Sequence, residues 1–139
     1  MRANSSTFRQ QLHMAFPTTE DRIAAEEAKL GVRLPSEYRN RLIAQNGGEL
    51  DTAGDDWQVF PVFDNTDRKR AGRTANHIYR ETQYAKKWHG FPEGAVAVAA
   101  NGTGDLLVFL AGQGECLGGR LHHWDHETAE VTPTPLDFT

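Results

Sequence analysis

Residues 31–48 constrain the fold of this 139-residue chain more than any other segment. Gly31 can adopt the left-handed conformation that ends a helix, and the residues before it, 19–30, have helical spacing behind a threonine cap and an acidic first turn. Pro35 presets the backbone of a second helix, 35–46, which the sequence Asn-Gly-Gly ends. The segment therefore predicts two short helices joined by a tight connection.

The rest of the chain passes from helical spacing to strand patterns. Residues 95–100 are continuously apolar, as expected for a strand that is covered on both faces. Helices followed by a run of strands predict an α+β fold, with N-terminal helices packed against a mainly antiparallel β-sheet in a single domain, 1–139. The other predicted elements are a leading helix at 6–15, a helix at 74–88, and strands at 57–63, 106–110, 120–124 and 130–132. The predicted core includes Leu34, Tyr38, Leu42, Val96, Val98, Leu107 and Phe109.

Composition excludes several classes of protein. Cys116 is the only cysteine, so an intrachain disulfide is excluded. No segment has the length and apolarity of a membrane span, and the first residues lack the apolar core of a signal peptide. We therefore expect a cytoplasmic protein that does not bind a membrane.

Charged residues are arranged in blocks along the chain. Residues 48–67 carry six acidic side chains and no Lys or Arg, whereas residues 68–90 carry seven basic side chains and one acidic one. Two interpretations stay open: the blocks steer a charged partner, or they face each other in the fold and are solvated. Because the net charge is −4, direct nucleic-acid binding by the basic block is the weaker interpretation.

The sequence contains no recognisable catalytic group. The glycine-rich segment 101–105 lies between two predicted strands, so it is expected to be a hairpin turn and not a phosphate-binding loop, with Asp105 bonding backbone amides of the turn. Cys116 lies in a glycine-rich turn without a group that would orient a base, so we predict a bystander thiol. The three tryptophans are expected to share a core: Trp57, Trp88 and Trp124.

Three histidines near the C-terminus could form a metal site. His123 can meet His126 across a bend, with Asp125 or Glu127 as a third ligand, whereas His122 points to the other face of its strand. The cluster lacks a second ligand group at a recognisable spacing, which favours a structural role. We therefore predict neither a metal nor a cofactor, and a small metal-dependent hydrolase that uses these histidines or Cys116 remains the least favoured alternative.

The order of particular residues along the chain resembles a known family. In the first half these residues are Ile23, Glu27, Leu30-Gly31, Leu34-Pro35, Tyr38, Leu42 and Asn46-Gly47-Gly48. In the second half they are Phe91-Pro92, Asn101-Gly102, Gly104-Asp105, the apolar residues 106–108, and Trp124-Asp125-His126-Glu127. The ordered set resembles the SUKH superfamily, most strongly over residues 8–132. That superfamily includes bacterial toxin-immunity proteins and the yeast Smi/Knr-type regulators of cell-wall assembly.

The resemblance implies a binding protein and not an enzyme. It favours an immunity protein that neutralises a cognate bacterial toxin, such as a nuclease, by covering its active site; the alternative is an intracellular adaptor of the Smi/Knr type. The acidic run has the charge to mimic a nucleic-acid backbone against a basic nuclease surface. The predicted partner-binding residues are Glu49, Asp51, Asp55, Asp56, Trp57 and Asp64, together with Asp125 and Glu127.

Overall fold

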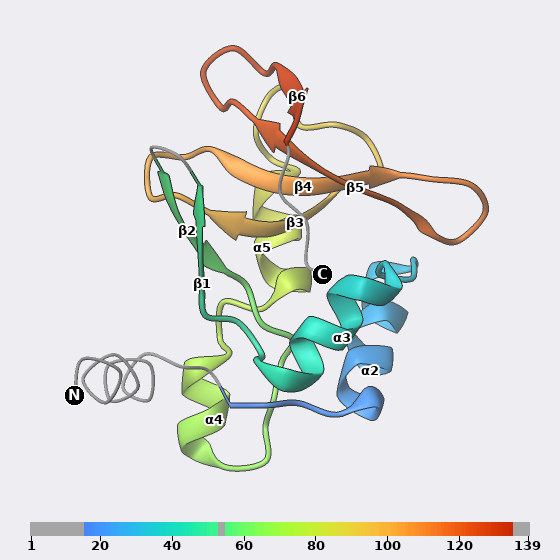
Figure 1. Ribbon diagram of the computed structural model, residues 1–139, viewed down its shortest axis with the longest axis vertical. Helices are drawn as coiled ribbons and strands as arrows, with labels where there is room; N and C mark the ends of the chain where they lie inside the picture. Colours follow the sequence, from blue (N-terminus) through green and yellow to red (C-terminus); the bar gives the residue numbers. More distant parts are fainter. Residues whose placement is uncertain (1–15, 53–54, 135–139) are drawn as a thin grey trace.

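The protein is an antiparallel sheet with helices on both faces, as seen in a computed structural model that describes residues 16–52 and 55–134. The six strands are paired in their order along the chain, and each neighbouring pair is antiparallel (Figure 1). The strands are β1 (Glu49–Thr52), β2 (Asp55–Val59), β3 (Val96–Ala100), β4 (Leu106–Ala111), β5 (Leu117–Trp124) and β6 (Val131–Pro133). The leading helix predicted at 6–15 lies outside the described residues.

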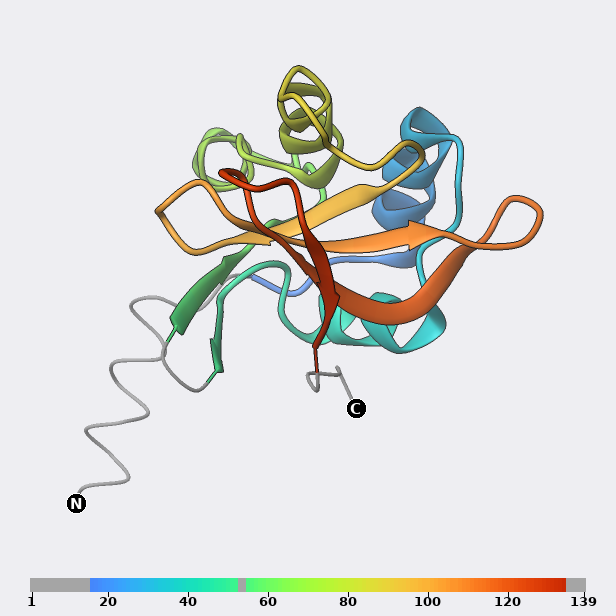
Figure 2. The ribbon, with the colours of Figure 1, turned by 90° about the horizontal axis from the view of Figure 1, so that it is seen from above.

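The helices are α2 (Glu20–Leu30), α3 (Ser36–Ala44), α4 (Arg68–Arg73) and α5 (Ile78–Ala85). Figure 2 shows α4 and α5 on one side of the sheet and α3 on the other, with α2 at the side. The predicted α+β fold with helices packed on an antiparallel sheet is therefore confirmed. None of the helices within the described ranges is both long and apolar enough to cross a membrane.

The α2–α3 segment forms as its residues predict. The Thr19 hydroxyl accepts a hydrogen bond from the backbone N–H of Arg22 at 3.4 Å, and Gly31 ends α2 with φ of 79°. The Glu27 carboxylate then accepts from the N–H of Leu34 at 2.8 Å and from Nε of Arg39 at 3.0 Å. These bonds fix the connection between the two helices.

A second buried carboxylate joins α2 to α5. Glu26 is 1% exposed, and its Oε2 accepts from the N–H of Tyr79 at 2.7 Å and lies 2.8 Å from Nδ1 of His77. Its Oε1 accepts from the N–H of Phe63 at 3.1 Å. The first N–H groups of a helix lack partners within that helix, so Glu26 caps α5 from a neighbouring helix.

The core lies on both faces of the central strands. All seven predicted core residues are buried, and the ring of Tyr38 on α3 packs edge-on against Phe109 on β4, with ring centroids 5.4 Å apart. On the other face, the hydroxyl of Thr82 on α5 accepts from the N–H of Ala97 at 3.0 Å, beside a bulge in β3. Helices therefore anchor to both faces of the same strands.

Three local predictions were wrong. Residues 49–52 and 55–56, where the sequence predicted no strand, belong to β1 and β2. The helix predicted at 74–88 is shorter, 78–85, and is preceded by the unpredicted helix α4. Trp57 and Trp124 are buried, but Trp88 follows the end of α5 and is 53% exposed, so it is not part of a shared core.

Candidate functional site

The β1–β2 hairpin presents acidic side chains at one edge of the sheet. β1 is the first strand of the sheet, and its register pairs Glu49 with Gln58 and Asp51 with Asp56. Like charges that face each other across two strands repel, which destabilises the pairing. Hydrogen bonding with Asp56, together with its charge, raises the pKa of Asp51 above its usual range. Asp51 and Asp56 are therefore like charges that oppose the pairing of their own strands.

The start of β2 lies beside the turn between β3 and β4. The side-chain amide of Asn101 is 3.5 Å from Oδ1 of Asp55. Trp57 points inward from the same strand and packs edge-on against His123 of β5, with ring centroids 5.2 Å apart. Side-chain contacts therefore link β2 to the β3–β4 turn and to β5.

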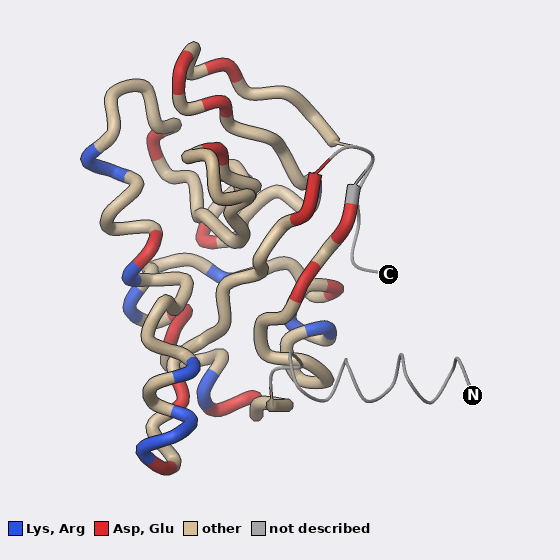
Figure 3. Tube along the Cα trace, turned by 90° about the vertical axis from the view of Figure 1, so that its left-hand side faces the viewer, with Lys and Arg blue, Asp and Glu red and all other residues tan. Residues whose placement is uncertain are grey.

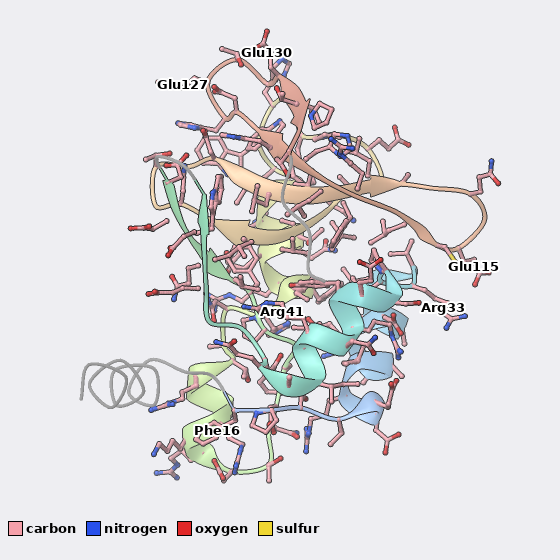
Figure 4. The ribbon with its side chains drawn as sticks, viewed as in Figure 1. Phe16, Arg33, Arg41, Glu115, Glu127 and Glu130 are labelled. Atoms are coloured by element: carbon pink, nitrogen blue, oxygen red, sulfur yellow. The ribbon has the colours of Figure 1, made fainter. Side chains whose placement is uncertain are left out.

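The turn between β5 and β6 brings further acidic residues to this end of the sheet. Asp125 holds the turn, since its Oδ1 accepts from the N–H groups of Glu127 at 2.8 Å and Thr128 at 3.1 Å. Glu127 is exposed at the top of the molecule (Figure 4). We call this surface the acidic end; it consists of Asp51, Asp55, Asp56, Asp125 and Glu127. Two groups of predicted site residues, far apart in sequence, are therefore on one end of the sheet.

Two of the predicted partner-binding residues lie inside the protein. Trp57 is 2% exposed and Asp64 is 4% exposed. Asp64 accepts from the N–H and hydroxyl of Thr66 at 2.9 and 2.6 Å, and it lies 3.4 Å from Arg22. Although burial opposes ionisation, these hydrogen bonds and the neighbouring arginines hold the pKa of Asp64 below its usual range. Neither residue is part of the acidic end, because burial removes both from the surface.

The structure places the two parts of the acidic run in different surroundings. Asp64 and Asp67 face the basic block, with Oδ2 of Asp64 3.9 Å and Oδ2 of Asp67 2.7 Å from Arg70. By contrast, none of the ion pairs among the described residues includes Asp51 or Asp56. Figure 3 shows acidic positions along the hairpin and in the β5–β6 turn, whereas Lys and Arg gather lower in the view along α4.

Asp105 joins two histidines at the base of the acidic end. Its Oδ2 lies 2.8 Å from Nε2 of His123, and its Oδ1 lies 2.6 Å from Nδ1 of His126 and accepts the N–H of that residue at 3.1 Å. Burial opposes ionisation of Asp105, but the bonds from His126 and His123 hold its pKa below the usual range. The hydrogen bond to Asp105 in turn raises the pKa of His126.

The prediction that Asp105 bonds the backbone amides of its own turn was wrong. Asn101, and not Asp105, fixes the turn through its bonds with the N–H and hydroxyl of Thr103 at 3.0 and 2.7 Å. The pairing of Leu106 with Trp124 places Asp105 opposite the residues that follow β5. Pairing the two predicted strands in antiparallel register would have revealed this contact.

Cys116 and His122 do not form a nucleophile–base pair, because they lie near opposite ends of β5. Cys116 is exposed in the β4–β5 turn, directly before β5, whereas His122 lies near the far end of that strand. An extended strand rises about 3.3 Å per residue, so the two backbones are roughly 20 Å apart. This distance excludes direct proton transfer between them.

A comparison with protein families identifies the family of this chain. The model of the SMI1 / KNR4 family (SUKH-1) matches residues 17–139. The chain is a member of the SMI1/KNR4 family. No curated protein and no solved structure matches the chain significantly. Family membership thus agrees with the predicted resemblance to the SUKH superfamily, and the matched range includes the whole acidic end.

Proposed function

We propose that this SMI1/KNR4-family protein is an immunity protein that binds a cognate bacterial toxin through the acidic end and inhibits it sterically. The observation that carries the proposal is that the β1–β2 hairpin and the β5–β6 turn both carry acidic residues at the same end of the sheet. Positive patches on one protein are attracted to negative patches on another, which accelerates encounter and fixes orientation. A nuclease has such a positive patch where it binds the phosphates of its substrate.

The fold suits a rigid inhibitor of this kind. The acidic residues are held by a paired hairpin and by a turn that Asp125 fixes with two hydrogen bonds. A surface that is ordered before binding loses little conformational entropy when it meets its partner. Inhibition then requires only that the acidic end covers the substrate groove, so the protein itself carries out no chemistry.

Co-purification with the product of the adjacent gene, followed by charge reversal, tests the proposal. The variant Asp55→Lys/Asp56→Lys is expected to lower the association rate at low ionic strength by at least about tenfold and to weaken its salt dependence. The control Glu93→Lys/Glu115→Lys changes the net charge equally at exposed positions, and Glu115 lies at the far end of the β4–β5 hairpin (Figure 4). Equal losses of association rate in both variants, or no loss in either, would show that the interface lies outside the acidic end.

The adaptor role is the second candidate, because the SUKH superfamily that the sequence resembles includes regulators as well as immunity proteins. Both roles use a binding surface, but they differ in partner. An immunity protein forms one tight complex with a toxin and restores the growth of cells that express it. An adaptor instead co-purifies with several host proteins and leaves toxin sensitivity unchanged, which growth assays with and without the adjacent gene distinguish.

A further inference from the structure

Three side chains that offer metal ligands meet where β4 begins and β5 ends. One carboxylate oxygen each of Asp105 and Asp125 and one imidazole nitrogen of His126 lie within 4.8 Å of one another. The antiparallel pairing of β4 with β5 brings them together from distant parts of the sequence. The cluster joins β4 to the turn that carries two of the five residues of the acidic end.

We propose that this cluster binds one divalent transition-metal ion, with Asp105, Asp125 and His126 as ligands and water in the remaining positions. A set of two carboxylates and one imidazole suits Zn²⁺ and similar ions, which take nitrogen and oxygen ligands at about 2.0–2.2 Å. Magnesium and calcium prefer shells made entirely of oxygen. The proposal concerns the cluster of Asp105, Asp125 and His126 and does not depend on toxin binding.

Asp105 is oriented by a neighbour outside the ligand set. Nε2 of His123 lies 2.8 Å from Oδ2 of Asp105, so Oδ1 is the oxygen that faces His126. The His123 ring is itself held edge-on against the buried Trp57, with centroids 5.2 Å apart. Partners of this kind fix the orientation of a metal ligand and strengthen binding.

His126 is also held in place before any ion arrives. A Cβ atom on Gly104 would lie 2.9 Å from the imidazole ring, so the ring packs directly on the glycine backbone. On another side it meets the indole of Trp88 edge-on, with centroids 6.1 Å apart. This contact gives a local role to Trp88, which is otherwise exposed.

Asp125 retains an oxygen for an ion while it holds the turn. Both backbone hydrogen bonds to its side chain within the described residues are accepted by Oδ1, from Glu127 and Thr128. Oδ2 can therefore turn toward Asp105 and His126 without breaking the turn. Asp105 and Asp125, with Glu127 next to His126 in the sequence, give the cluster the negative charge that attracts a cation.

The hydrogen bond between His126 and Asp105 occupies the position that the ion would take. Nδ1 of His126 and Oδ1 of Asp105 are 2.6 Å apart, which requires a proton between them. When the ion binds, the proton leaves Nδ1 and the two atoms move apart to coordinate the metal: an imidazolium releases the proton to solvent, and a neutral imidazole carries it on Nε2 instead, so charge and protons balance. The side chains of Asp105 and His126 are 16% and 23% exposed, which leaves access for the ion and its water ligands.

Titration of Zn²⁺ into tag-free, chelator-treated protein tests the proposal, with calorimetry for affinity and Co²⁺ absorption for coordination. We expect one ion per chain, visible Co²⁺ bands that report bound ligands, and no comparable binding of Mg²⁺. Asp105→Asn and His126→Ala should weaken Zn²⁺ binding by at least about tenfold, and His123→Ala by about tenfold through loss of orientation. The control His89→Ala removes an exposed histidine outside the cluster and should change nothing.

Thermal unfolding of each variant keeps the test decisive, because a variant that melts like the unmodified protein is folded when its metal affinity is measured. If His126→Ala does not fold, Asp125→Asn takes its place, since its side-chain amide oxygen can still accept the hydrogen bonds of the turn. Absence of Zn²⁺ binding, or the same affinity in Asp105→Asn and His89→Ala, would overturn the proposal.

Discussion

Carboxylates serve opposite purposes in two regions of this molecule. Between the helices, Glu26, Glu27 and Asp64 are buried, and each accepts hydrogen bonds from backbone amides while also contacting a cationic or histidine side chain. At the acidic end, Asp51 and Asp56 are exposed and face each other across two strands. The first region uses negative charge to hold elements together, whereas the second carries negative charge that weakens its own hairpin. The acidic end is therefore the better candidate for a binding surface.

Removal of Glu26 is expected to have the largest effect on stability. Glu26→Ala leaves the N–H groups of Phe63 and Tyr79 and the ring of His77 without their acceptor in a buried site. Each unsatisfied buried group costs about 1–3 kcal/mol, so the free energy of unfolding should fall by about 3 kcal/mol or more. Urea unfolding measures this change. A loss below about 1 kcal/mol would mean that water replaces the carboxylate and that the two regions differ less than proposed.

Asp64→Asn should have a smaller effect that depends on pH. The pKa of Asp64 is lowered in the folded protein, so its ionised form stabilises the fold above the pKa of the unfolded chain, and this contribution is lost as the pH falls through the folded-state value. At neutral pH the variant should lose about 1–2 kcal/mol. Unfolding measured from neutral to acidic pH should show the two proteins converge in acid; a constant difference would contradict the assigned cause.

Charge reversal at the acidic end should change stability very little. Asp55→Lys/Asp56→Lys is expected to keep the free energy of unfolding within about 0.5 kcal/mol of the unmodified value, as for most surface substitutions. The same variant is expected to lose affinity for the toxin. Chemical denaturation and binding, measured on one preparation, separate the two properties. A large loss of stability would show that these residues also hold the fold.

The smallest expected effect is an increase in stability. Asp51→Asn removes the repulsion from Asp56, so the melting temperature at neutral pH should rise slightly. Because the pKa of Asp51 is raised in the folded state, the penalty is full above that pKa and disappears as the pH falls and the carboxyl is protonated. The gain should therefore shrink toward acidic pH in differential scanning calorimetry. The same gain at every pH would show that charge repulsion is not its source.

The sequence predicted the elements whose residues act locally. Thr19, Gly31 and Pro35 mark helix ends through their own backbone and side-chain preferences, and the apolar strand 95–100 is buried as its composition predicts. The distinction between Asp64 and Asp56 was not predictable in this way. Both belong to one acidic run, and only the positions of Arg22 and Arg70 in the folded chain make one a structural residue.

Long-range pairing also explains the other errors. No strand was predicted at residues 49–52 and 55–56, because many of these residues are acidic and acidic residues are rare in strands. Asp105 was assigned to its own turn, since its two histidine partners lie beyond the next strand. Trp88 has helical spacing with Ala85 and Ile78, but the helix ends before it and its side chain is 53% exposed.

The position of β1 at the margin of the sheet has a consequence for solubility. An outer strand exposes backbone donors and acceptors that can pair with the outer strand of another molecule, which begins aggregation. Glu49 and Asp51 place negative charge along that strand, so two copies that approach edge to edge repel each other. The residues proposed to attract a basic partner therefore also keep copies of the chain apart when the protein is abundant and its partner is absent.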